Sequence, residues 1–354
     1  MQIYLDMVIF SLQKGGGISI LWKELVERFK KNRLDFFCIL LKKWRGNNLS
    51  DVCKDGVNII EGKNIIPLNF LRCLPIKIKL TSKAIVHSSY YRFSLSSHAI
   101  NVITVYDFTT NFYGKFGLKK WLHIWQKAYA IKKADGLICI SESTKHDLLT
   151  MYPSIKAEKI KVIYCGVSDD YFPLTNGNNV ASKYIVFVGG RGGYKHFDFV
   201  IRLLTRTNYH LTIVGGGALS AYEKELLNKY LYGRYNHISW ASNSELNEIY
   251  NQSFCLLYPS KYEGFGIPIA EAMKAGCPVL AYNASSIPEA AGAAGLLHND
   301  YEYESWIDSL NKLSDYEHRN KVISDGLAHA ETFTWDKMYN ETIAFYNELW
   351  ESVL

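Results

Sequence analysis

Two glutamates stand eight residues apart in a segment that reads YPSKYEGFGIPIAEAMKAGC, residues 258–277. Glu263 lies at a glycine-broken turn, and Glu271 lies in the apolar stretch that follows it. If a helix begins near Gly266, Glu271 is less than two turns from its start, because an α-helix has about 3.6 residues per turn. We therefore expect both carboxylates to face one ligand. A pair of acidic residues that caps a helix is the plainer alternative.

The turn between the two glutamates also offers backbone amides to a ligand. Gly264, Phe265, Gly266 and Ile267 lie where the predicted helix starts. The first amides of a helix have no acceptor within the helix and carry partial positive charge. We expect these residues to bind phosphate or sugar oxygens.

A second glycine-rich loop, FVGGRGGYKHF, places Arg191 and Lys195 beside bare backbone such as Gly190. Arginine presents a planar fork to pairs of oxygens, and lysine presents a point charge. Together the two cations suit a pyrophosphate and the negative charge that builds on a leaving phosphate. An ordinary surface charge pair is the alternative.

A third loop, QKGGGIS, contains Gly16 and Gly17 and precedes the amphipathic stretch ISILWKELVERFKK. Amides at the start of that helix could bind a phosphate or a sugar hydroxyl. A glycine turn between a strand and a helix also occurs for steric reasons alone. The pattern G-x-G-x-x-G is not met, which argues against a simple dinucleotide-binding protein.

Short apolar runs alternate with amphipathic stretches along the chain, and each of the three loops follows such a run. This alternation is typical of βα units, in which a parallel sheet is covered by helices on both faces. Pro, Gly and Asn cluster in residues 168–184, so we expect a boundary there. The predicted fold is α/β, with two doubly wound Rossmann-like domains, residues 1–170 and 171–334, that face one another across a cleft.

The chain has 354 residues, 48% of them hydrophobic and 21% charged, which suits a folded protein of two domains. Residues 1–170 hold 26 Lys and Arg against 14 Asp and Glu (+12), and the rest hold 14 against 20 (−6), within a total of +6. A basic half can bind nucleic acid, an anionic membrane or a phosphorylated substrate. The seven cysteines form no C-x-x-C pair, and we find neither a basic leader nor an apolar run of about 18 residues. We expect a cytoplasmic protein with reduced thiols.

Together these motifs resemble glycosyltransferase family 4, a family of retaining enzymes with the GT-B fold. The resemblance spans nearly the whole chain and also includes GLICISESTKHDL, IPEAAG and the closing stretch FTWDKMYNETIAFYNELW. It implies that Glu263 lies by hydroxyls of the transferred sugar and that Glu271 binds the nucleotide ribose. It further implies that the closing helix, about residues 335–354, returns to the N-terminal, acceptor-side domain, while residues 171–334 bind the nucleotide sugar.

One departure from the family pattern lies in VITVYDF, where Tyr106 stands in place of an expected histidine before Asp107. In the family that histidine is thought to contact the donor sugar. A tyrosine hydroxyl could still donate a hydrogen bond, without carrying charge near neutral pH. His87, in VHSSYY, is an alternative cleft residue, although a lone histidine at a strand end more often only completes the hydrogen bonding of the structure.

We expect no metal and no other cofactor, because the sequence has no D-x-D pair and no His/Cys cluster with ligand spacing. The resemblance then implies that Arg191, Lys195 and helix N-termini meet the charge of the diphosphate, and that substitution takes place on one face of the sugar without a covalent intermediate. We expect a nucleotide-sugar donor, GDP-mannose before UDP-hexose, and a lipid-linked or polysaccharide acceptor, with no role for nucleic acid. A nucleotide-sugar epimerase and a catalytically silent glycan-binding or scaffold protein are the alternatives.

Residues 115–133, KFGLKKWLHIWQKAYAIKK, combine aromatic side chains with lysines. If they form a helix, Trp121, Trp125 and Tyr129 lie along one face. We expect this stripe to pack on the sheet of the first domain, which leaves the lysines on the surface. The exposed lysines then predict peripheral, salt-sensitive binding of the first domain to the inner face of a bacterial cytoplasmic membrane.

Overall fold

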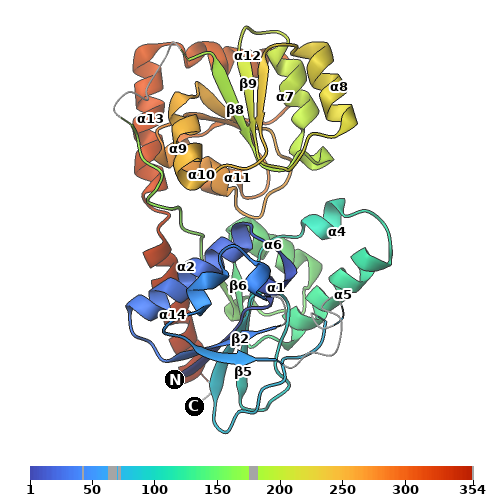
Figure 1. Ribbon diagram of the computed structural model, residues 1–354, viewed down its shortest axis with the longest axis vertical. Helices are drawn as coiled ribbons and strands as arrows, with labels where there is room; N and C mark the ends of the chain where they lie inside the picture. Colours follow the sequence, from blue (N-terminus) through green and yellow to red (C-terminus); the bar gives the residue numbers. More distant parts are fainter. Residues whose placement is uncertain (42–43, 63–69, 71–72, 175–181, 353–354) are drawn as a thin grey trace. The chain divides into compact units, whose positions relative to one another are not determined.

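The computed structural model describes residues 1–41, 44–62, 70, 73–174 and 182–352. The chain divides into two compact units: unit 1 consists of Met1–Gly166 together with Trp335–Leu354, and unit 2 consists of Val167–Thr334. Each unit has a parallel sheet with helices on both of its faces (Figure 1). The predicted α/β class with two Rossmann-like domains is confirmed.

Unit 1 contains a parallel sheet with the order β3-β2-β1-β4-β5-β6-β7. Its strands are β1 (Gln2–Asp6), β2 (Phe36–Leu40), β3 (Asn58–Glu61), β4 (Ala84–Ser88), β5 (Ala99–Val105), β6 (Gly136–Cys139) and β7 (Ile160–Val162). Leu5 of β1 pairs with Cys38 on one side and His87 on the other, and these central strands are buried because helices cover both faces. The strand order reverses between β1 and β4, the point where doubly wound folds bind ligands.

Six helices described in unit 1 surround this sheet. They are α1 (Val8–Leu12), α2 (Gly17–Lys31), α4 (Thr109–Tyr113), α5 (Leu118–Lys133), α6 (Glu142–Met151) and α14 (Trp335–Glu351). The short apolar run IYLDMVIF favours a strand, but β1 ends at Asp6 and α1 begins two residues later. Asp6 is buried and pairs with Arg92 at 2.7 Å, so this carboxylate is neutralised where the strand ends.

Helix α14 packs against α2 in unit 1, far along the sequence from the other elements of that unit. The Tyr339 ring meets the Phe29 ring edge-on at 5.7 Å, and Arg28 Nε lies 2.6 Å from Asp336 Oδ1. A Cβ added to Gly136, at the start of β6, would fall within 3 Å of side-chain carbons on α14. Glycine at this position therefore lets the helix lie close to the sheet.

Unit 2 contains a parallel sheet with the order β10-β9-β8-β11-β12-β13. Its strands are β8 (Tyr184–Val188), β9 (His210–Val214), β10 (Tyr235–Ile238), β11 (Cys255–Tyr258), β12 (Val279–Tyr282) and β13 (Leu296–His298). Its helices are α7 (Phe197–Leu204), α8 (Ala221–Tyr230), α9 (Asn243–Gln252), α10 (Ile267–Lys274), α11 (Ile287–Ala291), α12 (Tyr303–Lys312) and α13 (Tyr316–Ala330). Helices α8 and α9 each begin with a capping box, formed by Ser220 with Glu223 and by Ser242 with Glu245. A serine three residues before a glutamate favours this motif.

The segment that enters unit 2 is held by asparagines on one face of α9. Asn247 and Asn251 lie four residues apart, one helical turn. The Phe172 amide donates to Asn247 Oδ1 (3.0 Å), and the Leu174 amide donates to Asn251 Oδ1 (2.7 Å). Asn251 Nδ2 donates to the Phe172 carbonyl (3.0 Å). These side chains satisfy main-chain groups that have no strand partner.

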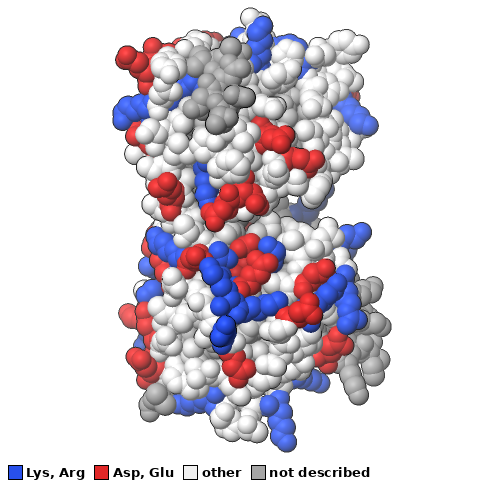
Figure 2. Space-filling view, turned by 60° about the vertical axis from the view of Figure 1, so that its left-hand side comes forward, with Lys and Arg blue, Asp and Glu red and all other residues white. Residues whose placement is uncertain are grey.

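Basic and acidic side chains lie next to one another on the face of the molecule that Figure 2 shows. Ion pairs also run along α2, where Lys23 pairs with Glu27 (3.2 Å) and Glu24 pairs with Arg28 (2.7 Å), each four residues apart. Within the described ranges, we find no helix that is both long enough and apolar enough to span a bilayer.

Candidate functional site

Lys195 and Glu263 meet in unit 2 although 68 positions separate them in the sequence. Lys195 ends the short 3₁₀ helix η4 (Gly193–Lys195) after β8, and Glu263 lies in the loop after β11. Because β8 and β11 are neighbours in a parallel sheet, their carboxyl ends deliver both side chains to one edge. Lys195 Nζ lies 2.5 Å from Glu263 Oε1, and only 13% and 12% of the two side chains are exposed. The predicted cation and carboxylate form one partly buried ion pair.

Two serines that follow β12 hold the loop of Glu263. The Glu263 amide donates to Ser285 Oγ (2.8 Å), and Ser286 Oγ donates to the Glu263 carbonyl (3.0 Å). Ser285 has a φ of 49°, in the left-handed region that serine seldom adopts. The sequence-based prediction omits both serines, and the signal for them is the polar pair that follows the strand run CPVLAY.

The turn that starts α10 brings bare backbone to the same edge of the sheet. Its N-cap, Gly266, has a φ of 101°, and an added Cβ would lie 3.3 Å from Ile269 Cδ1, so the position favours glycine. Because its N-cap is glycine, no N-cap side chain bonds the first amides of this helix. Phe265 is buried and anchors the turn in the core, while Gly264 and Ile267 are half-buried.

Glu271 lies in the second turn of α10, next to two tyrosines. The Tyr250 hydroxyl lies 3.3 Å from Glu271 Oε2, and the Tyr171 hydroxyl also hydrogen-bonds the carboxylate. Burial raises the pKa of Glu271 to about 7, and these two hydrogen bonds oppose the rise. Glu271 therefore changes charge near neutral pH. The sequence-based prediction includes Glu271 but neither tyrosine.

Arg191 is held by the turn after β9. Its Nε donates to Glu223 Oε1 (2.8 Å), and its Nη1 donates to the Gly215 carbonyl (2.7 Å). Nη2 lies within 3.2 Å of the carbonyls of the next three residues, Gly216, Gly217 and Ala218. Only 3% of the Arg191 side chain is exposed. The guanidinium thus fixes a turn of glycines, and its direct contact with a diphosphate stays a prediction.

The glycines around Arg191 differ in the space beside them. An added Cβ at Gly189, Gly190 or Gly193 would meet no atom within 4 Å. An added Cβ at Gly216 would instead lie 2.4 Å from Arg191 Nη1 and 2.7 Å from the Gly189 carbonyl oxygen. Open space beside bare backbone allows a ligand to approach main-chain amides closely, and Gly190 offers this arrangement.

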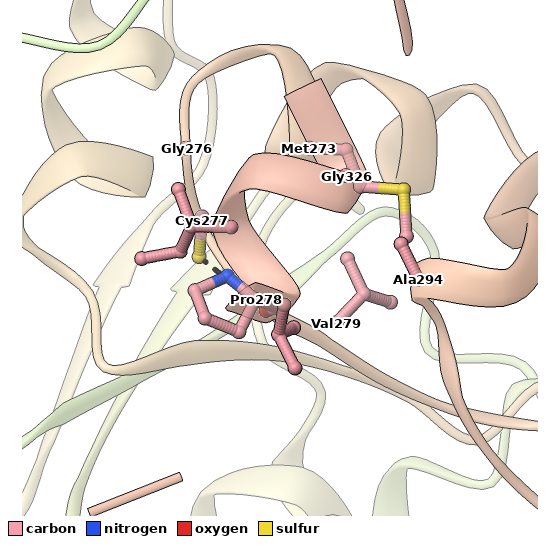
Figure 3. Close-up of a pocket in the computed structure, with 9 residues that line it drawn as sticks. Met273, Gly276, Cys277, Pro278, Val279, Ala294 and Gly326 are labelled. Carbon is pink, nitrogen blue, oxygen red and sulfur yellow. Dashed lines mark hydrogen bonds between the residues drawn. The ribbon is translucent and has the colours of Figure 1, made fainter. Parts of the chain in front are cut away.

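A small apolar pocket lies behind α10, between this helix and α13 (Figure 3). Met273 and Gly326 line it from the two helices, and Cys277 and Ala294 contribute from the connections between elements. Burial raises the pKa of the Cys277 thiol to about 12, so the thiol stays protonated and is a poor nucleophile. We interpret this pocket as part of the packing beneath α10.

In unit 1, Gly16 and Gly17 begin helix α2. Gly16 is the N-cap with a φ of 142°, Gly17 is the first helical residue, and both are exposed. Asn47 Nδ2 donates to the Gln13 carbonyl (2.8 Å) and to Ser19 Oγ (2.9 Å), which fixes the chain on either side of the two glycines. The backbone of this loop is therefore accessible and held in place.

Tyr106 is buried between β5 and α2. Its hydroxyl accepts a hydrogen bond from Trp22 Nε1 (2.7 Å) and donates one to the Ser89 carbonyl (3.0 Å). Burial raises the pKa of Tyr106 far above its ordinary value, so the hydroxyl stays neutral. The structure gives Tyr106 a packing role, and its catalytic role stays a prediction.

Asp107 is half-buried at the start of the loop between β5 and α4. Its Oδ1 accepts a hydrogen bond from the Thr109 amide (2.8 Å), and its carbonyl accepts one from Lys127 Nζ (2.9 Å). Lys127 Nζ also lies 3.1 Å from Asn111 Oδ1. Burial lowers the pKa of Lys127 to about 8, although the charge of Asp107 opposes this. The sequence-based prediction does not include Lys127 among the site residues, because it places all the lysines of this segment on the surface.

His87 is buried, and both of its ring nitrogens have partners. Nδ1 lies 2.5 Å from the Tyr346 hydroxyl of α14, and Nε2 lies 2.8 Å from Thr104 Oγ1. Burial lowers the pKa of His87 to about 3, so the ring is neutral at physiological pH. These contacts join α14 to the sheet. A contact between His87 and a substrate stays a prediction. No group of three or more His, Cys, Asp or Glu residues that could hold a metal is found where the chain is described.

Two family models match the chain, one for each half. The model described as "Glycosyltransferase Family 4" matches residues 15–171, and the model described as "Glycosyl transferases group 1" matches residues 173–328. An O-antigen chain mannosyltransferase B of Escherichia coli is 26% identical over 242 residues, which are 62% of each chain. The O-antigen chain mannosyltransferase RfbU of Salmonella typhimurium is 24% identical over 245 residues, 68% of this chain and 67% of that protein. The match thus spans about three fifths to two thirds of the length of these curated relatives.

Solved structures share the fold of the whole chain. A sucrose-phosphate synthase from Thermosynechococcus elongatus has a TM-score of 0.75 at 16% identity, with 99% of this chain and 100% of that chain covered. Anabaena HepE, solved in complex with UDP and glucose, also has a TM-score of 0.75 at 16% identity, with 98% and 100% covered. WaaG, described as a glycosyltransferase involved in lipopolysaccharide biosynthesis, has a TM-score of 0.69 at 15% identity, with 97% and 98% covered.

Proposed function

Because the chain belongs to glycosyltransferase family 4, we propose that it is a retaining hexosyltransferase of bacterial surface-glycan synthesis. It moves a hexose from a nucleotide-diphosphate sugar to a lipid-linked oligosaccharide or a polysaccharide. The observation that carries the proposal is the ion pair of Lys195 and Glu263, which lies at the carboxyl edge of a parallel sheet. The open backbone at Gly190 and the uncapped start of α10 lie at the ends of the same neighbouring strands.

The donor binds through groups of unit 2 in this proposal. The Lys195 ammonium and the first amides of α10 face the diphosphate, because both present positive charge. Glu271 accepts hydrogen bonds from the ribose hydroxyls, and Glu263 contacts hydroxyls of the sugar. Arg191 holds the glycine turn after β9 beside the Gly189 backbone, and its direct contact with the diphosphate stays a prediction.

Transfer of the sugar depends on the charges of Lys195 and Glu263 in this proposal. The bond between the anomeric carbon and the β-phosphate oxygen breaks, and both of its electrons leave with the phosphate. The acceptor hydroxyl forms the new bond on the same face of the sugar and gives its proton to the departing phosphate oxygen. Lys195 stabilises the developing phosphate charge, and Glu263 stabilises the positive charge that develops on the sugar. Anomeric configuration is retained without a covalent intermediate.

A protein ammonium and a helix N-terminus at the diphosphate provide the positive charge that a metal would otherwise supply. We therefore propose that transfer is metal-independent. The rate should be the same in buffer that contains EDTA and in buffer that contains Mg²⁺ or Mn²⁺. Loss of transfer in EDTA that is restored by added metal would overturn this part of the proposal.

GDP-mannose is the favoured donor. Mannosyltransferases of O-antigen chains stand among the relatives, whereas HepE, a more distant structural neighbour, was solved with UDP. UDP-hexoses are therefore the second choice. The short spacing between Arg191 and Lys195 also resembles that of mannosyltransferase-like members.

A screen of thermal unfolding against UDP, GDP, ADP and dTDP tests donor binding, since a ligand that binds the folded state raises the melting temperature. The diphosphate that raises it then identifies the sugar nucleotides for assays of hydrolysis and transfer, in which the released diphosphate is measured. Lys195→Met should abolish the thermal shift, and Lys224→Met, which changes an exposed lysine on α8, should not. Absence of binding, hydrolysis and transfer with every donor would contradict the proposal and favour a catalytically silent protein.

A lipid-linked acceptor would place the reaction at the inner face of the cytoplasmic membrane. We propose peripheral association there, because residues 1–170 have a net charge of +12 and anionic lipid attracts basic surfaces. Release of the protein from bacterial membranes by high salt would support this location, whereas recovery only in the soluble fraction at low salt would contradict it.

A further inference from the structure

Helix α5 buries three polar residues beside Ala130 and Ile131, and it turns its aromatic residues outward. His123, Gln126 and Lys127 are buried, whereas Trp121 is 66% exposed and Trp125 is 57% exposed. A helix on the surface of a globular protein ordinarily shows the opposite pattern. The expectation that the aromatic stripe packs on the sheet is therefore wrong. It failed because an amphipathic period identifies a face but not the direction in which that face points.

Hydrogen bonds made by the buried residues fix this orientation. Lys127 Nζ donates to the Asp107 carbonyl (2.9 Å), and Gln126 Nε2 donates to the Tyr91 carbonyl (3.3 Å). The Lys127 ammonium also stands over the Phe108 ring, 4.6 Å from its centroid. If the helix rotated to bury its tryptophans, these buried polar groups would lose their partners. Exposure of the aromatic face is thus built into the packing of α5.

Exposed apolar side chains also lie at the start of α5 and in the connection from α4. Leu118, the first residue of α5, is 85% exposed, and Phe116 in that connection is 92% exposed. Trp125 and Tyr129 stack in parallel, 5.6 Å between ring centroids, so the stripe along the helix is ordered. We call the following set the α5 aromatic face: Phe112, Tyr113, Phe116, Leu118, Trp121, Trp125 and Tyr129. Seven exposed apolar or aromatic side chains within residues 112–129 are more than the scattered single residues of an ordinary surface, and such sets mark an interaction site.

The charge around the α5 aromatic face has one sign. Residues 108–134 contain six lysines and no Asp or Glu. Lys115, Lys119, Lys132 and Lys133 are exposed, and Lys133 lies 5.9 Å from the Tyr129 ring centroid. The lysines therefore border the aromatic side chains directly. This face offers both an apolar surface and a positive charge to its partner.

We propose that the α5 aromatic face inserts into the interfacial layer of an anionic lipid bilayer, where it anchors unit 1. Trp and Tyr favour the headgroup level, because one end of each ring system is polar. Lysines that border an apolar helix face bind anionic headgroups while that face enters the boundary of the acyl chains. A second copy of this chain fits less well, because a two-fold contact through this face would bring its lysines together.

This inference deepens the peripheral location proposed above, and it is independent of the donor and of the chemistry. Its test uses the full chain and vesicles of phosphatidylglycerol mixed with phosphatidylcholine, with phosphatidylcholine vesicles for comparison. We expect the protein to sediment with the anionic vesicles at low salt, and its tryptophan emission to shift to the blue as side chains leave water. Brominated lipid should quench that emission.

The double variant Trp121→Ser/Trp125→Ser should bind anionic vesicles at least about tenfold more weakly, because it loses the insertion. Lys119→Glu/Lys132→Glu/Lys133→Glu should lose binding at low salt as well, because it repels the headgroups. The matched control is Trp240→Ser in unit 2, which removes an equally exposed tryptophan (72%) and should bind as the wild type does. Circular dichroism and the melting temperature check that every variant is folded.

Failure of the wild type to bind anionic vesicles at low salt would overturn this inference, as would equal binding by the double tryptophan variant. Sedimentation equilibrium without lipid tests whether a second copy of this chain binds the face instead. If the wild type is a dimer and the double tryptophan variant is a monomer, the face serves self-association and not lipid binding. The thermal shift with nucleotide diphosphate should be the same in all these variants. Loss of lipid binding with an unchanged nucleotide shift separates this inference from the proposed catalytic function.

Discussion

In the structure the Glu263 carboxylate is the counterion of Lys195, 2.5 Å from its ammonium. Under the proposed function, a diphosphate that binds Lys195 would have to displace this carboxylate, which would then be available to the sugar. We therefore propose that the pair links recognition of the diphosphate to the position of Glu263.

Replacement of Lys195 by methionine keeps the length of the side chain and removes its charge. We expect turnover to fall by about 10²–10³, as for the loss of one donor to a developing oxyanion, because the leaving phosphate then lacks its cation. Steady-state rates with the preferred donor measure this. Lys224→Met serves as the control, and activity of Lys195→Met within a few fold of the wild type would remove Lys195 from the site.

Glu271 should make nucleotide binding depend on pH. With its pKa raised to about 7, the carboxyl is neutral at acidic pH and ionised at alkaline pH, and the ionised form is the better acceptor for ribose hydroxyls. We therefore expect affinity for the nucleotide diphosphate to rise between about pH 6 and pH 8. Isothermal titration calorimetry across this range tests it, and Glu271→Gln should flatten the profile.

The same group affects stability in the opposite direction. A carboxyl whose pKa is higher in the folded than in the unfolded chain stabilises the fold at low pH, and this contribution is lost as pH rises through about 7. Glu271→Gln should thus gain melting temperature relative to the wild type at pH 8 but not at pH 5. A constant difference across this range would mean that Glu271 does not titrate there.

Which single residues lie close together was predictable from sequence only where a motif covers them. Lys195 and Glu263 lie in loops after strands, and the structure brings them together. Tyr106 and His87 also follow or end strands, but their side chains point into packing with α2 and α14. The sequence cannot show this, because the partners lie 84 and 259 positions away.

At the scale of elements, two glycine loops of similar composition have different tasks. Gly216 makes room for the Arg191 guanidinium, whereas Gly190 borders open space. The loop after β9 is therefore fixed by a side chain, and we propose that the loop after β8 offers its backbone to a ligand. A pair of alanine substitutions separates these tasks.

Gly216→Ala should destabilise the protein by about 1–3 kcal/mol, because alanine is strained at a φ of 73° and its methyl group displaces Arg191. Gly190→Ala should change stability by less than about 0.5 kcal/mol and instead weaken binding of the nucleotide diphosphate. Urea denaturation and calorimetry measure the two effects. If both variants lost stability equally, the assignment of separate tasks would be wrong.

The elements themselves were predictable because the apolar period changes between strands and helices. In unit 2 the sequence has amphipathic stretches near residues 196–206, 218–232 and 243–251, and these form α7, α8 and α9. Helix α5 was also predictable as a helix, but not its orientation. That orientation depends on main-chain acceptors at Asp107 and Tyr91, and no pattern within residues 118–133 indicates them.

At the scale of the whole molecule, the two units differ in their surfaces and in their proposed tasks. Unit 2 contains the ion pair, the open glycine loop and the uncapped helix, all formed by a continuous stretch of chain. Unit 1 contains the α5 aromatic face and most of the excess positive charge. We expect variants of unit 2 to change nucleotide binding and variants of α5 to change only the attachment to lipid.

The place of α14 has a consequence for biosynthesis on the ribosome. Unit 1 contains the first residues to be made, yet its helix α14 is translated after every residue of unit 2. The contacts of His87 with Tyr346 and of Phe29 with Tyr339 can form only after both tyrosines have been translated. The usual order, in which the N-terminal domain folds first, should therefore be reversed. The test uses nascent chains that are stalled once residue 334 has left the ribosome. In these chains we expect residues 167–334 to resist protease while residues 1–166 are still cut. Protection of both segments at the same time would contradict this order.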